Sequence, residues 1–169
     1  MRWISEDDVA AIYDIFSDPQ VMRYWSSGPL TDREAAAAMQ RDIADGNRSG
    51  LKWKWGLALN DTNVLIGTVT LFNLSLDNGR AEIGYAMGRK YWGQGYMHEA
   101  LTALIVHAFD VLNLRRLEAD VDPRNTSSVR SLERLGFQRE GLLRERWHVG
   151  GELQDAYFYG LLKREWKRG

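Results

Sequence analysis

Three apolar segments in the middle of this 169-residue chain are separated by turns too short for any arrangement but antiparallel strands. Residues 51–59 alternate apolar and polar positions, residues 64–74 are rich in β-branched side chains, and residues 80–88 follow a turn at LDNG. Alternation and β-branching predict strands, and connections of a few residues join antiparallel neighbours. These segments therefore predict the centre of an antiparallel sheet.

Helical patterns precede this predicted sheet. Residues 6–16 carry apolar side chains at helical spacing, and Ser5 before them is a suitable N-cap. After a segment broken by two prolines, residues 30–46 predict a second helix, with Thr31 as its cap and Gly46 as its stop. The chain thus enters the sheet through two helices.

Strands and helices alternate in the second half of the chain. Apolar positions over residues 97–112 define one helical face, residues 115–121 predict a strand, and a short helix ends at Gly136. Two final strands are predicted at about residues 137–148 and 155–163.

The order of these segments determines the expected fold class. We expect an α/β protein of the mixed α+β kind, with a central mixed, mostly antiparallel sheet of about six or seven strands flanked by helices. No internal repeat, low-complexity tract or linker interrupts the sequence, so a single domain over residues 1–169 is expected.

Composition narrows the classes of function and partner. The net charge of −1 gives no general attraction to nucleic acid or to an anionic membrane surface, and no apolar run approaches the roughly 20 residues that span a bilayer. The acidic N-terminal segment lacks the apolar core of a signal peptide. Zero cysteines exclude disulfides and thiolate chemistry, and three scattered histidines form no metal-binding pattern. A cytoplasmic protein without nucleic-acid, membrane or metal partners is expected.

A glycine-rich loop, KYWGQG, lies between the third predicted strand and the following helix. Glycine at a helix start costs about 1 kcal/mol relative to alanine, so Gly93 and Gly95 serve either a tight turn or a bound anion. Free N–H groups at a helix start favour an anion, and Arg89 and Lys90 add positive charge. No Gly-Lys-Ser/Thr follows, which excludes a Walker A loop, and His98 replaces the third glycine of a dinucleotide fingerprint.

The wider sequence resembles one enzyme family. The pattern Lys90-x-x-Gly93-x-Gly95 resembles the acyl-CoA loop of the GNAT superfamily of N-acyltransferases, although that family usually has Gln or Arg in place of Lys90. Three segments in the same order, FSDPQVMRYW, AEIGYAMGRKYWGQGYMHEAL and NTSSVRSLERLGFQREG, resemble the GNAT subgroup that acetylates ribosomal-protein N-termini. One departure is that only residues 1–3 precede the first helical segment, where the family usually has a fuller strand.

This resemblance implies a GNAT fold and an activity. The implied reaction is direct transfer of acetyl from acetyl-CoA to a primary amine in a ternary complex, without a metal. The acceptor would be a protein or peptide N-terminal amine or a small amine, and the subgroup implies a homodimer. The residues that the resemblance assigns to the cofactor are Tyr85, Ala86 and Met87 through their backbone, Arg89, Lys90, Trp92, Gly93, Gln94, Gly95 and Tyr96 in the loop, and Asn125 and Arg130 beyond it.

Glu82 is the candidate general base. On a strand it shares a face with Gly84 and Ala86, whose small side chains leave room for a substrate. A peptide α-amine has a pKa near 8, so its neutral form is already present and a carboxylate acting through water suffices as the base. The resemblance supports this role, and the alternative is an ordinary solvent-facing glutamate.

Other candidates also have structural alternatives. The resemblance assigns Ser128 to the leaving thiolate as a catalytic hydrogen-bond donor, but Ser128 also suits the first turn of a helix for which Asn125 is the N-cap. Trp25 is the candidate acceptor contact, whereas Trp53, Trp55, Trp147 and Tyr157 to Tyr159 are expected in the core.

Two other functions stay open on the sequence. One is a non-catalytic acyl-CoA-binding or regulatory module that keeps the loop without turnover, and the other is a small-molecule acetyltransferase acting on antibiotics or amino acids.

Overall fold

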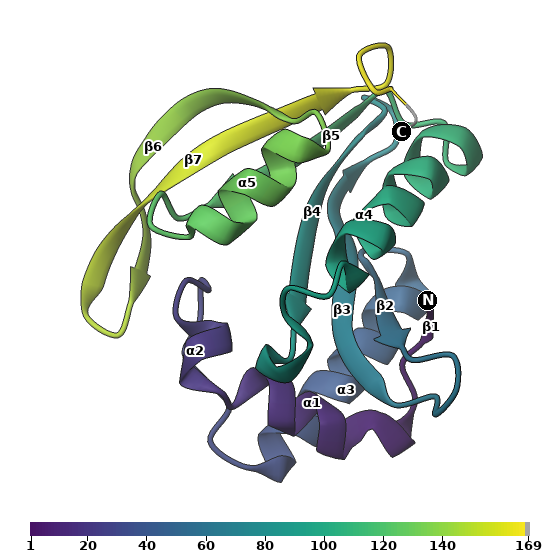
Figure 1. Cartoon of the computed structure of the whole chain (residues 1–169), viewed down its shortest axis with the longest axis vertical. Helices are drawn as coiled ribbons and strands as arrows, with labels where there is room; N and C mark the ends of the chain where they lie inside the picture. Colours follow the sequence, from purple (N-terminus) through teal and green to yellow (C-terminus); the bar gives the residue numbers. More distant parts are fainter. Residues whose placement is uncertain (168–169) are drawn as a thin grey trace.

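The computed structural model describes residues 1–167 and contains a seven-stranded sheet with helices on both faces (Figure 1). The strands lie in the order β1-β2-β3-β4-β5-β7-β6. They are β1 (Arg2–Trp3), β2 (Trp53–Ala58), β3 (Leu65–Ser75), β4 (Arg80–Met87), β5 (Arg116–Val121), β6 (Gln138–Val149) and β7 (Glu152–Leu162). The α-helices are α1 (Val9–Phe16), α2 (Pro19–Met22), α3 (Arg33–Ser49), α4 (Tyr96–Val106) and α5 (Thr126–Arg134), with short helical turns η1 (Glu6–Asp8), η2 (Arg89–Tyr91) and η3 (His107–Val111).

The predicted sheet is confirmed. Strand β3 pairs antiparallel with β2 on one side and with β4 on the other, as the short connections between them require. Strands β6 and β7 form an antiparallel hairpin. Within residues 1–167, only β4 and β5 pair in parallel, because α4 carries the chain back across the sheet between them. The fold is therefore mixed α/β with a mostly antiparallel sheet.

The parallel pair of β4 and β5 is short. Its register runs through three residue pairs and ends where Glu82 lies opposite Glu118. Beyond this point the two strands separate, as Figure 1 shows, and in the described chain no strand pairs with this edge of β4. The backbone of β4 from Ile83 to Met87 thus keeps hydrogen-bonding groups available for another partner.

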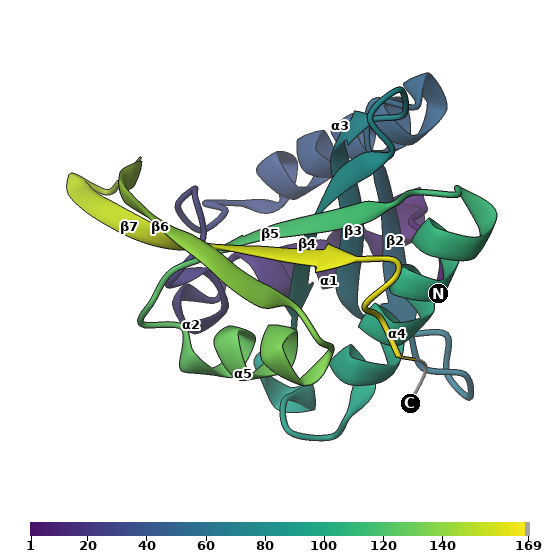
Figure 2. The same cartoon turned by 90° about the horizontal axis from the view of Figure 1, so that it is seen from above.

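Helices cover both faces of the sheet (Figure 2), and each face has its own apolar core. On one face, α4 and α5 pack on the sheet through buried side chains that include Leu101, Leu104 and Leu132. On the other face, α1 and α3 contribute buried Ile12 and Ile43. These layers hold β4 rigidly from both sides while leaving its edge open.

The second helix differs from its prediction at both ends. Asp32, rather than Thr31, is the N-cap of α3, because its Oδ1 accepts a hydrogen bond of 2.8 Å from Ala35 N. The helix continues through Gly46 and ends at Gly50, whose φ of +72° is the left-handed C-cap conformation. A Cβ on Gly46 would lie 2.6 Å from the Lys52 side chain, so this glycine permits close packing rather than termination.

A strand precedes the first helix, as in the family that the sequence resembles, but it is only two residues long. Arg2 and Trp3 pair with β2, and Arg2 makes a bidentate ion pair with Asp8, with both N–O distances 2.7 Å. This pair lowers the pKa of Asp8 and fixes β1 to the start of the first helical segment. No helix among residues 1–167 has the length and apolar character needed to cross a membrane.

We expect Gly67→Ala to destabilise the protein by about 1–3 kcal/mol, because the new methyl would overpack the β3–β4 contact. A Cβ at Gly67 would lie 2.6 Å from Ala86 O and 3.2 Å from Met87 Cα, both backbone atoms that cannot rotate away. Gly141→Ala is the matched control, since that strand position has no atom within 4 Å of an added Cβ. Urea denaturation of both variants checks this, and equal stabilities would contradict it.

Candidate active site

Two cavities meet in the opening between β4 and β5. The Glu82 cavity has a volume of about 350 Å³ and the glycine-loop cavity about 490 Å³. Both are lined by the same five residues, Tyr24, Trp25, Tyr85, Asn125 and Ser128. A molecule in one cavity can therefore reach a molecule in the other at this junction.

The glycine-loop cavity has the properties of an anion site. Gly93 and Gly95 adopt φ of +74° and +86°, and an added Cβ on either would meet open space. Gly95 is the N-cap of α4 and has no side chain to cap it, and the first three residues of this helix line the cavity. The loop is held in place by Trp92, whose Nε1 donates a 2.7 Å hydrogen bond to Met87 O. The positive-φ turn and the start of α4 thus form one continuous wall of this cavity.

The charged residues predicted near this loop lie in different surroundings. Arg89 is exposed and pairs with Asp18 at 3.3 Å, and the Lys90 ammonium lies over the Tyr91 ring at 5.0 Å. Arg130 is exposed and lines neither cavity as the described residues define them, whereas Arg134, one turn later on α5, lines the glycine-loop cavity. Helical periodicity explains the difference, because residues 127, 128, 131 and 134 share one face of α5. Gln94 donates its side-chain amide to Lys90 O and helps to shape the loop.

The unpaired edge of β4 lines both cavities. Tyr85 lines both, and Ala86 and Met87 line the glycine-loop cavity. The Tyr85 side chain crosses the opening to α5, where its hydroxyl donates a long hydrogen bond of 3.5 Å to Ser128 O. Burial raises the pKa of Tyr85 to about 12, so this hydroxyl stays protonated.

Asn125 and Ser128 meet at the junction through a helix cap. Asn125 Oδ1 accepts hydrogen bonds from Ser128 N at 3.2 Å and from Ser127 Oγ at 2.9 Å, which confirms Asn125 as the N-cap of α5. Within residues 1–167, Asn125 Nδ2 and Ser128 Oγ make no hydrogen bond. The cap therefore orients two free polar groups toward the cavities.

Glu82 is buried, not solvent-facing, with 8% of its surface exposed. Asn73 Nδ2 donates a 2.9 Å hydrogen bond to Glu82 Oε2, from a register shift in β3 where Asn73 adopts a φ of 49°. Burial is the main reason why the pKa of Glu82 is raised, and nearby Asp120 adds to it. The alternative of an ordinary surface glutamate is therefore wrong.

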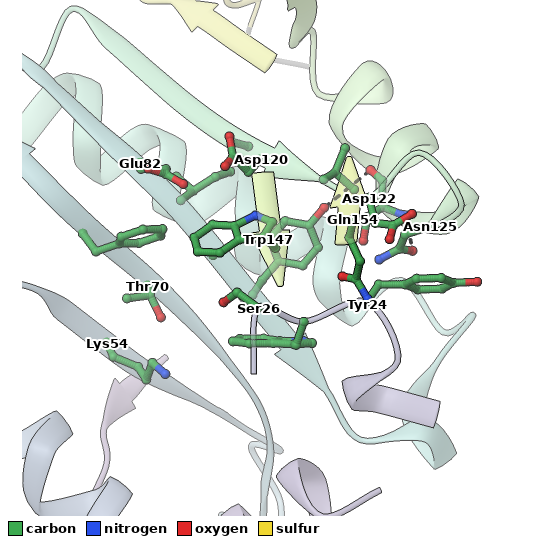
Figure 3. A pocket seen from close by; sticks show the side chains of 18 of the residues that line it. Tyr24, Ser26, Lys54, Thr70, Glu82, Asp120, Asp122, Asn125, Trp147 and Gln154 are labelled. Atoms are coloured by element: carbon green, nitrogen blue, oxygen red, sulfur yellow. Dashed lines mark hydrogen bonds between the residues drawn. The ribbon is translucent and has the colours of Figure 1, made fainter. Parts of the chain in front are cut away.

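Aromatic side chains form the walls of the Glu82 cavity (Figure 3). Trp25 lines it and packs edge-on against Phe16, with ring centroids 5.5 Å apart. Trp147, expected in the core, instead lines the cavity with 37% of its surface exposed. The reason is an irregularity in the β6–β7 register between Leu143 and Trp147, where Glu145 has a φ of 51°. Such a bulge changes the direction of the side chains that follow it.

Several charged residues of this cavity were not predicted from the sequence. Asp120 pairs with Arg146 at 3.0 Å, and Asp122 pairs with Arg124 at 2.7 Å. Lys54 lines the cavity, and burial lowers the pKa of its ammonium to about 8. The signal that could have found Lys54 is strand register, because it lies on the face that Glu82 occupies two strands away.

Among residues 1–167, no three His, Cys, Asp or Glu side chains are grouped closely enough to hold a metal ion. The groups that line the Glu82 cavity are carboxylates, lysine ammonium groups and aromatic rings. The glycine-loop cavity is lined by a helix start and a strand edge.

Comparisons with known proteins identify the family of this chain. The family model described as an acetyltransferase (GNAT) domain matches residues 1–138. The chain is 40% identical to the uncharacterized N-acetyltransferase p20 of Bacillus licheniformis, over 98% of this chain and 93% of that protein. It is 30% identical to the [ribosomal protein uS5]-alanine N-acetyltransferase of Escherichia coli, over 75% of this chain and 66% of that protein.

A solved GNAT-family acetyltransferase from Bacillus anthracis superposes with a TM-score of 0.86 at 27% identity, covering 97% of this chain and 94% of the other. Both the sequence matches and the shared fold thus extend over most of the chain. The chain belongs to the GNAT family of N-acetyltransferases.

Proposed function

We propose that this protein transfers the acetyl group of acetyl-CoA to a primary amine while both substrates are bound. The observation that carries this proposal is the junction of two cavities, one lined by a buried carboxylate and the other by an uncapped helix start. Coenzyme A is an extended anion, and the amine must approach from the opposite side for direct transfer.

The glycine-loop cavity fits coenzyme A. Its pyrophosphate would be held by the first N–H groups of α4 around Gly93 and Gly95, where the absence of a Cβ lets backbone and phosphate approach closely. Trp92 and Tyr96 would flank it, and Arg23 and Arg134, which both line the cavity, offer positive charge. The pantetheine amides would pair with the open edge of β4 from Tyr85 to Met87, as an added strand would. Bound acetyl-CoA supplies an activated thioester to the junction.

Glu82 would accept the proton of the amine. A buried carboxylate with a raised pKa is a stronger base than a surface glutamate. Because the α-amine of a peptide is already partly neutral near its pKa, the base has only to remove the proton that is released during the attack. The hydrogen bond from Asn73 fixes the orientation of the carboxylate. Transfer through a bound water would bridge the remaining distance to the junction.

Polar groups at the start of α5 would bind coenzyme A and its departing thiolate. Asn125 Nδ2 would donate to a pantetheine carbonyl, because Asn125 Oδ1 is already used by the helix cap. Ser128 Oγ would donate a hydrogen bond to the departing thiolate, and Tyr85 would keep α5 at this distance from β4. The N–H groups of the open β4 edge would stabilise the thioester oxygen.

The acceptor that we propose is the amine of a protein or peptide N-terminus, in agreement with the alanine specificity in the name of the Escherichia coli relative. Trp25, between the two cavities, would contact the first residue of that acceptor. Measuring thiol release with a panel of N-terminal peptides, amino acids and antibiotic amines separates this acceptor from a small molecule. Tight coenzyme A binding without turnover on any amine would favour a non-catalytic module.

We expect Glu82→Gln to lower kcat about ten- to a thousand-fold, the usual effect of losing a general base. The amide keeps the size of the side chain and can still accept from Asn73, so the cavity should keep its shape. Steady-state kinetics across about pH 6 to 9 test this, with the coenzyme A dissociation constant as the control that should not change. Full activity of the variant at every pH would remove Glu82 from the mechanism.

The same substitution should change how stability depends on pH. Because the folded-state pKa of Glu82 is raised, Glu82 favours folding below its unfolded pKa and loses this contribution as pH rises through its folded pKa. Ionising a carboxyl whose folded-state pKa is raised costs folding free energy, so the stability of Glu82→Gln relative to the wild type should increase as pH rises past the unfolded pKa of glutamate. Urea denaturation at several pH values measures the difference. Glu99→Gln, on the exposed side of α4, is the control and should show no such trend.

Gly95→Val should weaken coenzyme A binding about tenfold or more, because valine cannot adopt a φ of +86° without moving the start of α4. Gly50→Val is the matched control, since Gly50 has a similar φ of +72° at the far end of α3. Both variants should lose stability, but only the first should lose affinity in isothermal titration calorimetry. Wild-type affinity in Gly95→Val would exclude the loop as the phosphate site.

A further inference from the structure

Lys54 differs from the other cations around the Glu82 cavity because its charge is not neutralised. Lys52, which lines the same cavity, forms an ion pair with Asp42, and Arg124 and Arg146 pair with aspartates. In the described part of the chain, the Lys54 ammonium forms neither a hydrogen bond nor an ion pair.

This ammonium packs on an aromatic ring, and the charges that act on it are those of Lys52 and Asp42. It lies over the Phe16 ring, 5.4 Å from the centroid, and Trp25 packs against the edge of the same ring. Burial, assisted by the neighbouring charge of Lys52, lowers the pKa of Lys54 to about 8. Keeping a desolvated cation without a counter-ion in a cavity costs free energy. An anionic group on a bound ligand would reduce this cost.

Strand register defines where this cation lies relative to Glu82. Lys54 pairs with Thr70, and Thr70 pairs with Gly84, so the three form one row across β2, β3 and β4 on a single face. Glu82 lies in the next row of β4, opposite Phe72. Two strand spacings, about 10 Å, therefore separate the backbones of Lys54 and β4 along the floor of the cavity.

Thr70 adds a second group at the Lys54 end. Its side chain is buried, lines the cavity and comes from the position directly beside Lys54. Figure 3 shows Lys54 and Thr70 on the side of the cavity away from Asn125, with the ammonium end of Lys54 turned toward the cavity. A hydroxyl and an ammonium side by side are a suitable pair of donors for a carboxylate.

We propose that Lys54 and Thr70 bind a carboxylate of the acceptor, several bonds from the amine that is acetylated. This inference rests on the proposed function, because it places the amine near Glu82 and the junction. In a free α-amino acid a single carbon separates the amine from the carboxylate, which is too short to reach from the junction to β2. A peptide whose second residue is acidic, or a short peptide with a free C-terminus, has the required length.

The test measures binding of three N-acetylated peptides, which cannot be acetylated again, by isothermal titration calorimetry. Acetyl-Ala-Glu-Ala amide carries a side-chain carboxylate, acetyl-Ala-Gln-Ala carries only a C-terminal one, and acetyl-Ala-Gln-Ala amide carries none. The wild-type protein should bind at least one carboxylate ligand about tenfold or more tightly than the uncharged amide, and the better ligand identifies the source of the carboxylate. Equal binding of all three, or no binding of any, would overturn the proposal.

Variants of the two neighbouring lysines make the test specific. Lys54→Met should abolish the preference for carboxylate, Lys54→Arg should keep most of it, and Lys52→Met should leave it within about twofold. Thermal denaturation checks that each variant is folded, and removing a desolvated charge in Lys54→Met should not lower stability. A preference that survives Lys54→Met would show that this lysine only packs on Phe16.

Kinetics with the corresponding free-amine peptides separate this proposal from the proposed function. Selective binding without any acetyl transfer would contradict the enzymatic role but leave the carboxylate site intact. Turnover of both carboxylate and amide peptides with the same KM would overturn the carboxylate site and leave the acetyltransferase activity intact. In Lys54→Met, the KM for acetyl-CoA should stay unchanged while the KM for a carboxylate peptide rises about tenfold or more.

Discussion

The early end of the parallel pairing between β4 and β5 is the constraint on which the site depends. After Glu82 and Glu118 the two strands separate, and the edge of β4 keeps unpaired backbone groups beside the opening. Helices pack on both faces of the sheet around β4. Both cavities, and the five residues that they share, lie at this opening.

Charge is distributed unevenly around the opening. Most ionisable groups are neutralised within the protein, as in the pairs of Asp120 with Arg146 and Asp122 with Arg124. Glu82 and Lys54 differ from these pairs, because burial disfavours the charged form of each and neither has an ion-pair partner within residues 1–167. Groups kept in such states are typical of sites that a ligand completes.

Some of the residues with positive φ lie near the same place. Asn73, Gly93, Gly95 and Glu145 all have positive φ, and each directs a neighbouring group toward one of the cavities. Asn73 reaches Glu82, the two glycines open the start of α4, and Glu145 belongs to the bulge before Trp147. The fold thus tolerates unfavourable dihedral angles where they orient the site.

Much of this protein was determined by its sequence alone. Short connections and side-chain period were enough to predict the antiparallel strands, and the glycine loop with its neighbouring segments indicated the family, because these signals are local. Local signals also identified Asn125 as a cap and Glu82 as a candidate. Helix ends at Asp32 and Gly50 were missed, since capping depends on which side chain reaches the backbone and on how Gly46 packs. Only the tertiary structure decided that Lys54, Thr70 and Trp147 join Glu82 in one cavity, because strand register and a bulge bring together residues that lie far apart in the chain.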